Sequence, residues 1–360
     1  MKKILTIIGA RPQFVKEAVL SRLIRSEEWK ALFHETILHT GQHYDENMSE
    51  IFFRDMQIPK PDIQLHIGGT THGAMTGQML MEIEAALIRV KPDMVLVYGD
   101  TNSTLAGALA ASKLHIPVVH VEAGLRSYNM RMPEEQNRIL TDHLSTWLFC
   151  PTDTAVKNLD REGITNGVHQ VGDIMYDATL YYQNVLLNEE KQGLNRLENI
   201  GLKKIPQQFL LATIHRAENT DDATRLAQIV EALSEAPYDI ILPLHPRTRK
   251  KLFESKIELG DNIQTIEPIG YLEMLALELR AEAIITDSGG VQKEAYFLRK
   301  PCITLRDETE WIENLENGWN ILVGADKEKI LNAINLKVIP IDHPNLFGIG
   351  KTGSKILSQL

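Results

Sequence analysis

Residues 94–114 read MVLVYGDTNSTLAGALAASKL, and this stretch decides the fold. Its first part, 94–97, is a run of apolar residues short enough for a buried strand, and the Ala-rich segment 105–114 favours a helix. The polar turn 98–104 joins the two and contains a glycine and an aspartate. A buried strand that leads through a short turn into a helix is typical of parallel sheets, so this stretch predicts an α/β fold.

The same alternation of short apolar strands and helices continues in both directions along the chain. In the first half it predicts strands over 4–8, 35–39, 117–121 and 147–150, and helices over 13–24, 78–90, 134–145 and 154–162. In the second half it predicts strands over 209–213, 240–244, 263–266, 283–286, 302–305 and 321–323, and helices over 223–233, 246–259, 272–279, 291–298 and 327–335. The charged stretch 188–208, which carries Gly, Asn and Pro, separates the two series.

This organisation predicts two Rossmann-like, doubly wound domains, over residues 1–187 and 188–345. A length of 360 residues agrees with two domains at ~150 residues each. We expect the active site in a cleft between the domains, because open parallel sheets bind ligands beyond the carboxyl ends of their strands.

The composition excludes several classes of protein. With 43% hydrophobic and 24% charged residues, the chain is ordinary for a globular protein, and its net charge of −10 argues against non-specific binding to nucleic acid or anionic lipid. Residues 1–8 lack the features of a secretory signal, and no apolar run is long enough to span a bilayer, so we expect a soluble cytoplasmic protein. The two cysteines, Cys150 and Cys302, lie in separate apolar runs and are predicted to be buried, reduced thiols.

Acids, bases and cations follow the predicted strands in both halves of the chain. They are Arg11 and Lys16, Asp100, Glu122 and Arg126, His215 and Arg216, His245 and Arg247, Asp287, and Arg306. Any one of them is explained equally well as a cap or turn residue. Their agreement over seven strand ends favours a polar site at the rim of the sheets.

Glycines in the second half indicate a phosphate site. Ser288-Gly289-Gly290 precedes a predicted helix, and such a turn lets the backbone approach an anion at the helix N-terminus, so we interpret it as a diphosphate cradle. Glu294 lies near the start of that helix and either compensates its dipole or accepts both hydroxyls of a ribose. The stretch 9–12, GARP, lacks the glycine spacing of a dinucleotide fingerprint, which makes a nicotinamide cofactor unexpected.

Three carboxylates and one histidine form the predicted acid–base set: Asp100, Glu122, Glu134 and His215. Asp100 and Glu134 also suit helix starts, which is the alternative interpretation of both. Five histidines of the first half raise the question of a metal; they are His34, His39, His43, His66 and His72. We expect no metal, because no acidic or cysteine partner completes a site at recognisable spacing.

The ordered set of motifs resembles the non-hydrolysing UDP-N-acetylglucosamine 2-epimerase family over residues 3 to about 345. The motifs are GARP at 9–12 with Lys16, TGQH at 40–43, GDT at 99–101, HVEAGLR at 120–126, PEE at 133–135 with NR at 137–138, TDH at 141–143, HR at 215–216, and TDSGG at 286–290 through Glu294. The resemblance implies a glycosyltransferase-B-like fold in which the C-terminal segment 346–360, with a helix over 351–360, crosses back to the first domain. It also implies a homodimer that needs neither a metal nor a nicotinamide.

Enzymes of this family invert C2 of a UDP-linked 2-acetamido sugar. They remove the C2 proton, expel UDP to give a 2-acetamidoglycal, and add both back with the proton on the opposite face. Carried over to this chain, the resemblance implies Asp100, Glu122 and Glu134 as catalytic carboxylates and His215 as the essential histidine. Which of them takes the proton from each face is left open.

The resemblance also assigns residues that hold the substrate. Arg11, Lys16 and the turn Ser288-Gly289-Gly290 would stabilise the charge that grows on the leaving diphosphate. Glu294 matches the residue that holds the uridine ribose, and Tyr271 falls in the uracil-binding stretch. Arg126, Arg216 and Arg306 complete the predicted substrate-binding set.

Two departures from the family's motifs bear on which sugar the enzyme accepts. Many members that act on UDP-N-acetylglucosamine have a Pro-Trp-Pro-Glu-Glu loop and a Thr-Glu-Arg-Pro-Glu stretch, whereas this chain reads RMPEE at 131–135 and TEW at 309–311. It also reads QHYDENM at 42–48, where those members have an Arg-Glu-Met segment linked to an allosteric site. These changes resemble the subgroup that epimerises UDP-2,3-diacetamido-2,3-dideoxy-glucuronate for surface polysaccharides such as lipopolysaccharide. We expect this substrate, with Arg131 as the partner of its extra carboxylate.

Other functions remain open at this point. UDP-N-acetylglucosamine itself is the alternative substrate, giving UDP-N-acetylmannosamine. A hydrolysing epimerase would release free N-acetylmannosamine and UDP, and a glycosyltransferase of the same fold would need an acceptor. A nucleotide-sugar-binding regulator without turnover is a different class, and the presence of the four predicted catalytic residues argues against it.

Overall fold

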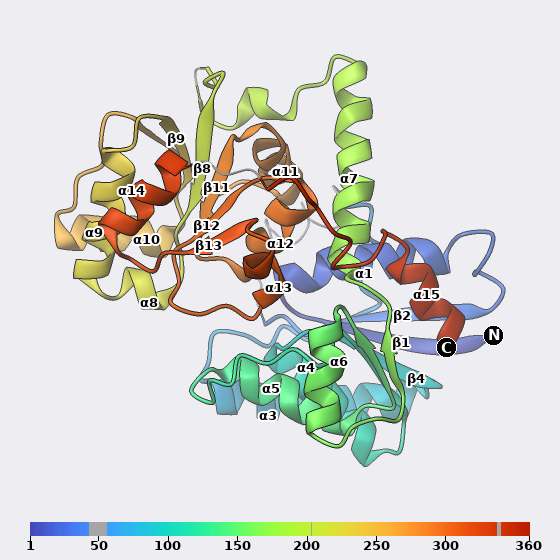
Figure 1. Cartoon of the computed structure of the whole chain (residues 1–360). Coiled ribbons are helices and arrows are strands. Elements are labelled where there is room, and N and C mark those ends of the chain that lie inside the picture. Colours follow the sequence, from blue (N-terminus) through green and yellow to red (C-terminus); the bar gives the residue numbers. More distant parts are fainter. Residues whose placement is uncertain (43–55, 203, 337–339) are drawn as a thin grey trace. The chain divides into compact units, whose positions relative to one another are not determined.

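The computed structural model describes residues 1–42, 56–202, 204–336 and 340–360. The chain divides into two compact units: unit 1 comprises residues 1–180 with 345–360, and unit 2 comprises residues 181–344 (Figure 1). The units divide inside the helix α7 (Ile174–Lys191), and the sequence-based boundary after residue 187 falls in the same helix.

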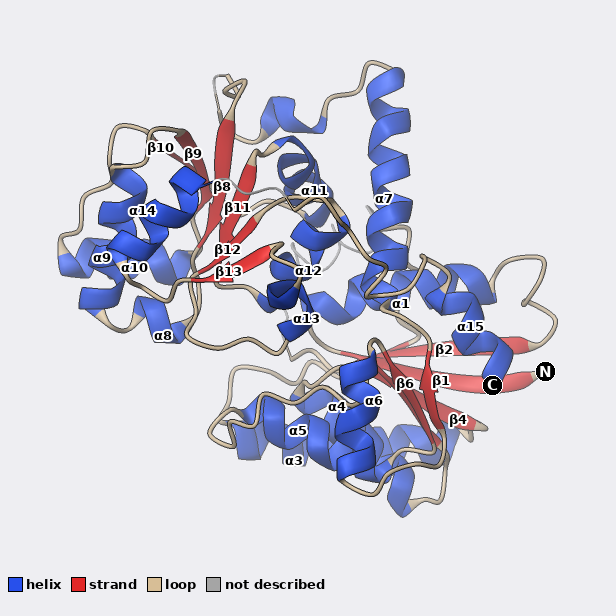
Figure 2. Ribbon diagram, in the orientation of Figure 1, coloured by secondary structure: helices blue, strands red, loops and turns tan. Residues whose placement is uncertain are grey.

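Unit 1 contains a sheet of seven parallel strands in the order β3-β2-β1-β4-β5-β6-β7. Its strands are drawn in red in Figure 2, where β1, β2, β4 and β6 are labelled. The strands are β1 (Lys2–Ile8), β2 (Phe33–His39), β3 (Ile63–Gln64), β4 (Met94–Tyr98), β5 (Val118–Val121), β6 (Trp147–Cys150) and β7 (Val168–Gln170). Every residue of β4 is buried, as expected for a strand that helices cover on both faces. The order reverses between β1 and β4, which makes the carboxyl ends of these two strands the topological switch point.

Seven helices belong wholly or partly to the described part of unit 1. They are α1 (Arg11–Ile24), α3 (His72–Val90), α4 (Asn102–Lys113), α5 (Pro133–Leu144), α6 (Asp153–Arg161), the first part of α7, and α15 (Thr352–Gln359). The C-terminal helix α15 packs on α1, where a Cβ at Gly353 would lie 2.5 Å from Leu23 Cδ1. Close contact between the two helices therefore depends on the glycine.

Unit 2 contains six parallel strands in the order β10-β9-β8-β11-β12-β13, with its own switch point between β8 and β11. The strands are β8 (Phe209–Thr213), β9 (Asp239–Pro243), β10 (Ile263–Ile266), β11 (Ala283–Thr286), β12 (Cys302–Thr304) and β13 (Asn320–Leu322). The helices are α8 (Ala217–Thr220), α9 (Ala223–Ser234), α10 (Pro246–Ser255), α11 (Tyr271–Arg280), α12 (Gly289–Phe297), α13 (Ile312–Glu316) and α14 (Lys327–Leu336), with a 3₁₀ turn η1 (Arg196–Asn199).

The predicted α/β fold with two parallel sheets is confirmed, with local differences. The strands β3 and β7 were not predicted because two and three residues show no periodicity. The helix α7 was not predicted either, since its tyrosines and polar residues give no single apolar stripe. The predicted helix 246–259 ends early, at Ser255, because Lys256 takes a left-handed conformation with φ 53°.

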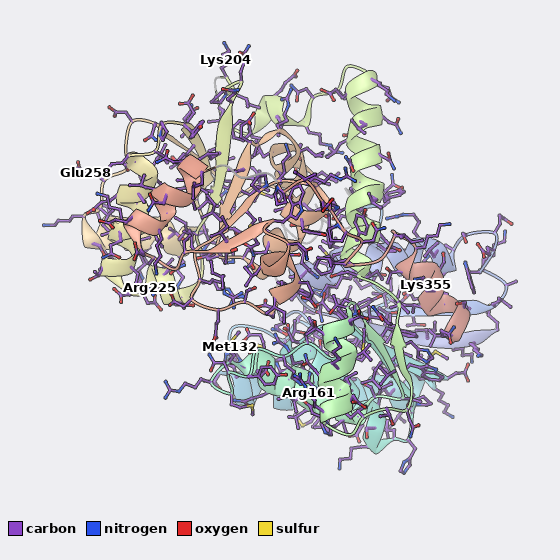
Figure 3. The ribbon with its side chains drawn as sticks, in the orientation of Figure 1. Met132, Arg161, Lys204, Arg225, Glu258 and Lys355 are labelled. Carbon is purple, nitrogen blue, oxygen red and sulfur yellow. The ribbon has the colours of Figure 1, made fainter. Side chains whose placement is uncertain are left out.

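Burial follows polarity in both units. Cys150 and Cys302 are buried and free, as predicted, and burial raises the pKa of the Cys302 thiol to about 12. Charged side chains such as Arg161, Lys204, Glu258 and Lys355 are exposed (Figure 3). Among the described residues, no helix has both the length and the hydropathy needed to cross a membrane.

Candidate active site

A buried glutamine fixes the switch point of unit 1. Gln13 Oε1 accepts from the N–H groups of Gly9 and Ala10 at 2.8 and 3.0 Å, and its Nε2 donates to the carbonyl oxygen of Tyr98 at 2.9 Å. The side chain thus joins the turn after β1 to the end of β4. The sequence analysis did not single out Gln13, although an amide at the third position of a helix is the signal of a capping box.

Lys16 and Glu122 form a buried ion pair beside this switch point. Lys16 Nζ is 2.6 Å from Glu122 Oε1, and the two side chains are only 7% and 10% exposed. A side chain at Gly99 would come within 3.3 Å of Lys16 Nζ and 3.4 Å of Glu122 Oε1, so the glycine leaves room for the pair. Glu122 has φ 72°, a conformation that costs free energy in a non-glycine residue and is concentrated at functional sites.

Asp100 lies at the end of β4 and faces a cation from α5. Its Oδ2 is 2.6 Å from Arg138 Nη2, and its side chain keeps 31% exposure. The carbonyl oxygen of Asp100 accepts from Asn137 Nδ2 at 2.9 Å. The helix α5 therefore holds both the backbone and the carboxylate of this predicted catalytic residue.

Two adjacent glutamates at the start of α5 have different environments. Glu135 is buried, accepts from the N–H groups of Ser127 and Tyr128 at 2.9 Å, and pairs with Arg138 at 2.8 Å. Burial alone would raise the pKa of Glu135, but these hydrogen bonds and the Arg138 charge lower it. Glu134, the predicted catalytic residue, is exposed. It lies one turn before Arg138, on the side of α5 that faces Asp100.

Glu135 also anchors the loop that carries Arg131. The side-chain hydroxyl and the N–H of Ser127 both donate to Glu135 Oε2 at 2.9 Å. Arg131 follows on this loop, its side chain is exposed, and its N–H donates to Asn129 Oδ1 at 3.1 Å. The guanidinium that we predicted to meet a sugar carboxylate is therefore accessible.

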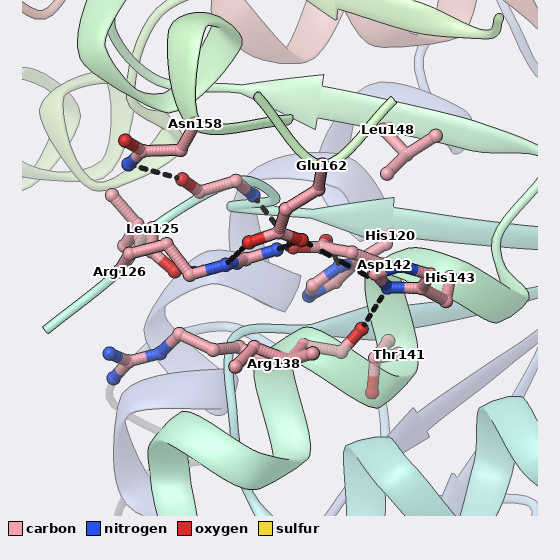
Figure 4. A network of polar contacts seen from close by, with 12 residues as sticks. His120, Leu125, Arg126, Arg138, Thr141, Asp142, His143, Leu148, Asn158 and Glu162 are labelled. Atoms are coloured by element: carbon pink, nitrogen blue, oxygen red, sulfur yellow. Dashed lines mark hydrogen bonds and ion pairs between the residues drawn. The ribbon is translucent and has the colours of Figure 1, made fainter. Parts of the chain in front are cut away.

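Arg126 belongs to a buried polar network (Figure 4). Its Nε and Nη2 donate to the two carboxylate oxygens of Glu162 at 2.6 and 2.7 Å. Its Nη1 donates to Asp142 Oδ2 and to the carbonyl oxygen of Leu125, both at 2.7 Å. These contacts engage all three guanidinium nitrogens inside unit 1, and substrate binding by Arg126 stays a prediction.

In unit 2 a buried carboxylate joins the turns that follow β8 and β11, the two strands at the switch point. Asp287, after β11, accepts from the N–H groups of His215 and Arg216, which follow β8, at 3.0–3.1 Å. Asn219 Nδ2 donates to the same carboxylate at 3.2 Å, and His215 Nδ1 is 3.4 Å from Asp287 Oδ1. The His215 side chain is 41% exposed, so its imidazole is both oriented by Asp287 and open to a ligand.

The predicted phosphate turn lies at the N-terminus of α12. Ser288 is the N-cap residue, and its N–H donates to Thr286 Oγ1 at 2.9 Å. A Cβ at Gly289 would come within 2.5 Å of Glu310 Oε1, so only glycine fits there without a shift. Arg306 is fully buried and pairs with Glu310 at 2.9 Å, next to this turn; its role toward substrate stays a prediction.

Glu294 and Tyr271 are both buried in unit 2. Glu294 faces Glu278 of α11, whose pKa is raised well above its usual value by burial and, in addition, by the charge of Glu294. Tyr271 begins α11 and packs edge-on against Tyr182, with ring centroids 5.7 Å apart. Glu294 thus lies on α12 against Glu278 of α11, Tyr271 lies at the start of α11, and their roles toward uridine stay predictions.

Some predicted features cannot be placed. The side chain of Arg11, the stretch 43–48 and with it His43 lie outside the described residues. Burial and the neighbouring His66 lower the pKa of His39 to about 4, which keeps this imidazole neutral. In the described ranges, no three His, Cys, Asp or Glu side chains gather as metal ligands would.

Comparison with known proteins agrees with this geometry. A family model described as UDP-N-acetylglucosamine 2-epimerase matches residues 27–360. The chain is 53% identical to a UDP-N-acetylglucosamine 2-epimerase homolog of Methanococcus maripaludis and 52% identical to the UDP-2,3-diacetamido-2,3-dideoxy-D-glucuronate 2-epimerase of Pseudomonas aeruginosa, with 99% of both chains covered in each case. It also matches the crystal structure of Methanocaldococcus jannaschii UDP-GlcNAc 2-epimerase in complex with UDP-GlcNAc and UDP, with a TM-score of 0.89, 46% identity and 99% of both chains covered. The predicted glycosyltransferase-B-like fold and the resemblance are confirmed, and the chain belongs to the UDP-N-acetylglucosamine 2-epimerase family.

Proposed function

We propose that this UDP-sugar 2-epimerase acts on UDP-2,3-diacetamido-2,3-dideoxy-D-glucuronate and converts it to the manno epimer for surface polysaccharide synthesis. The observation that carries the proposal is the exposed Arg131 on a loop that Glu135 anchors, because Glu135 also pairs with Arg138, the partner of Asp100. A guanidinium there suits a uronate carboxylate, which it can bind through two hydrogen bonds. The 52% identity with the Pseudomonas aeruginosa enzyme supports the same substrate.

The carboxylates of unit 1 would move the C2 proton. Asp100 and Glu122 each lie beside a buried cation, Arg138 and Lys16 respectively, and Glu134 is exposed near Asp100. Inversion at C2 needs one group to remove the proton from one face and another to return it to the opposite face. A set of separate carboxylates meets this requirement.

Unit 2 would bind the UDP leaving group. The N-terminal turn of α12, opened by Gly289 and Gly290, suits the diphosphate because the positive end of the helix dipole stabilises a growing negative charge. Glu294 would accept the hydroxyls of the ribose. His215, oriented by Asp287, would contact the reacting end of the UDP-sugar.

A second substrate is favoured by a specific observation. The chain is 49% identical over 99% of its length to the UDP-N-acetylglucosamine 2-epimerase of Methanocaldococcus jannaschii, nearly as similar as to the uronate enzyme. UDP-N-acetylglucosamine is therefore the alternative, and Arg131 would then have no sugar carboxylate to bind. For either substrate we propose that the protein is cytoplasmic and forms a homodimer. Light scattering of the purified chain would test the oligomeric state.

Deuterium exchange distinguishes the two substrates. The protein is incubated in deuterated water with each UDP-sugar and no acceptor, and NMR follows deuteration at C2 and appearance of the manno epimer. Turnover of the diacetamido uronate alone, reduced in Arg131→Gln, supports the proposal. Equal turnover of UDP-N-acetylglucosamine overturns the assigned sugar, and deuteration of neither overturns the epimerase activity on both.

A further inference from the structure

A fully buried histidine connects the polar network of unit 1 to the turn that carries Asp100. His120, in β5, has its Nδ1 2.7 Å from Asp142 Oδ1 (Figure 4). Its Nε2 is 2.8 Å from the carbonyl oxygen of Gly99. Asp142 is in turn bound by Arg126, as described above. One continuous series of hydrogen bonds therefore runs from α5 to the end of β4.

The partners of His120 determine where its protons lie. A carbonyl oxygen only accepts, so His120 Nε2 carries a proton and donates it to Gly99. Asp142 Oδ2 accepts from Arg126 Nη1 at 2.7 Å and from the N–H of Gly124 at 3.1 Å. Burial would raise the pKa of Asp142, but the hydrogen bond and charge of His120 and the charge of Arg126 lower it. The contact with the Gly99 carbonyl oxygen requires only that Nε2 of His120 is the donor.

Gly99 is joined to β5 on both sides, through the N–H of the peptide before it and the carbonyl oxygen of the peptide after it. The N–H of Gly99 donates to the carbonyl oxygen of Val121 at 3.0 Å, and its φ of 62° suits glycine. Its Cα lies beside the Lys16–Glu122 pair, as the short distances from a Cβ placed there show. The peptide that His120 binds leads directly into Asp100, so its rotation would move that carboxylate relative to the ion pair.

We propose that His120 is a positioning residue of the epimerase: by donating from Nε2 to the Gly99 carbonyl, it fixes the Gly99–Asp100 peptide and holds Asp100 at its working distance from the Lys16–Glu122 pair. The inference rests on the proposed function, since it takes Asp100 and Glu122 as groups that move the C2 proton. His120 is fully buried and acts through the backbone, not on the substrate. Its loss should therefore lower kcat and leave KM nearly unchanged.

Two substitutions separate the two hydrogen bonds of the ring. A glutamine amide can place its N–H where Nε2 lies, whereas an asparagine amide reaches only the place of Nδ1. We expect His120→Asn to lower kcat for C2 exchange by about 100-fold, the loss typical of a catalytic group displaced by ~1 Å, and His120→Gln to recover much of it. Equal kcat in wild type and His120→Asn, or a change in KM alone, would overturn the proposal.

Val119→Ala is the matched control for lost stability. Val119 is the neighbouring residue of β5, is fully buried, and points to the opposite face of the sheet, so it packs without reaching the Gly99 turn. We expect Val119→Ala to lower the melting temperature but keep kcat. If Val119→Ala loses as much kcat as His120→Asn at the same melting temperature, the effect is general destabilisation and the positioning role is wrong.

A measurement on the unaltered chain covers the case in which the variants do not fold. With ¹⁵N-labelled histidine, NMR should show His120 with a proton on Nε2 that exchanges slowly with water; an unprotonated Nε2 would overturn the inference. Exchange at C2 is measured first in the wild type with both UDP-sugars. Absence of exchange there overturns the proposed function and the role of His120 with it, whereas normal exchange in both wild type and His120→Asn overturns the positioning role alone.

Discussion

The switch points of the two sheets have the same topology, but the side chains that join their turns differ in charge and in hydrogen bonding. In unit 1 a neutral amide, Gln13, joins the two turns, and charged side chains such as Lys16 and Glu122 pair beside them. In unit 2 a carboxylate, Asp287, joins the turns by accepting backbone N–H groups, and an exposed imidazole, His215, stands next to it. Under the proposed function, unit 1 would supply carboxylates for proton transfer, and unit 2 would supply a helix N-terminus for the diphosphate. Side chains at the strand ends, not the fold, decide which chemistry each unit performs.

The largest effect should come from removing a carboxylate of unit 1. Asp100→Asn keeps the shape of the side chain but cannot accept a proton, so we expect C2 exchange to fall by about 10²- to 10⁴-fold. UDP binding, measured by calorimetry, should not change, because Asp100 is not among the residues predicted to hold UDP. Normal turnover in Asp100→Asn would show that Asp100 takes no part in the reaction. It would also contradict the assignment of proton transfer to unit 1 and of UDP binding to unit 2.

A substitution in unit 2 should instead weaken the binding of UDP. Glu294→Ala removes the predicted acceptor for the ribose hydroxyls, and hydrogen bonds to a charged group contribute about 1.5–3 kcal/mol, so the Kd for UDP should rise about 10- to 100-fold. Calorimetry with UDP measures this, and uridine should show a similar loss if the ribose is the group recognised. An unchanged Kd would contradict the assignment of Glu294.

A smaller effect is expected at the start of α12. In Gly289→Ala the added Cβ would come within 2.5 Å of Glu310 Oε1, a carboxylate that Arg306 holds in place. We expect the first turn of α12 to shift and the affinity for UDP to fall more than the affinity for uridine, which lacks the diphosphate. In Gly290→Ala the added Cβ would meet only Ser288 Oγ, at 3.9 Å, so that variant leaves the turn uncrowded within the chain and tests the approach of the diphosphate alone. Wild-type affinity for UDP in Gly289→Ala would argue against a crowded phosphate turn.

The smallest effect concerns stability and pH. Because the native pKa of Glu278 is raised by burial and by Glu294, its carboxyl stabilises the fold below the unfolded pKa of about 4.3 and loses this contribution as the pH rises toward the native pKa. Glu278→Gln cannot ionise, so it should match wild type in acid and melt about 2–4 °C higher at neutral pH. Parallel melting profiles across this range would contradict the prediction.

Glu135 of unit 1 should behave in the opposite sense. Its native pKa is lowered, because the N–H groups of Ser127 and Tyr128 and the charge of Arg138 outweigh burial. The ionised carboxylate therefore stabilises the fold above the unfolded pKa and loses this contribution as the pH falls through the native pKa. Glu135→Gln should melt below wild type at neutral pH, with the difference shrinking in acid. Thermal unfolding of both glutamine variants over one pH series tests the contrast directly.

Much of the fold could be predicted from local pattern. The strands 147–150, 209–213, 263–266 and 283–286 were predicted with the bounds that the structure shows. Apolar runs of four or five residues bounded by polar turns carry this information within the run itself. The ends of helices were less accurate, since a terminus such as Lys256 depends on the conformation of a single residue.

The candidate site was predicted only as a set of residue types at strand ends. Glu134 and Glu135 are indistinguishable by pattern, yet one is exposed and the other is buried against Ser127 and Arg138. The roles of Gln13 and His120 were also missed. Their partners lie far along the chain, at Tyr98 and Gly99, and no local spacing indicates such contacts.

The strand–helix alternation, the two parallel sheets and the family could be predicted from the residues alone, because each depends on short-range periodicity or on ordered motifs. The pairing of charged groups, the burial of one carboxylate and the hydrogen bond from His120 to the Gly99 carbonyl became known only from the folded chain. The physical reason is that β4 and β5 bring these groups together through their register, in which Val97 pairs with His120 and Tyr98 with Val121. Hydrogen bonds within 3 Å are set by that register, and it forms only when the sheet does.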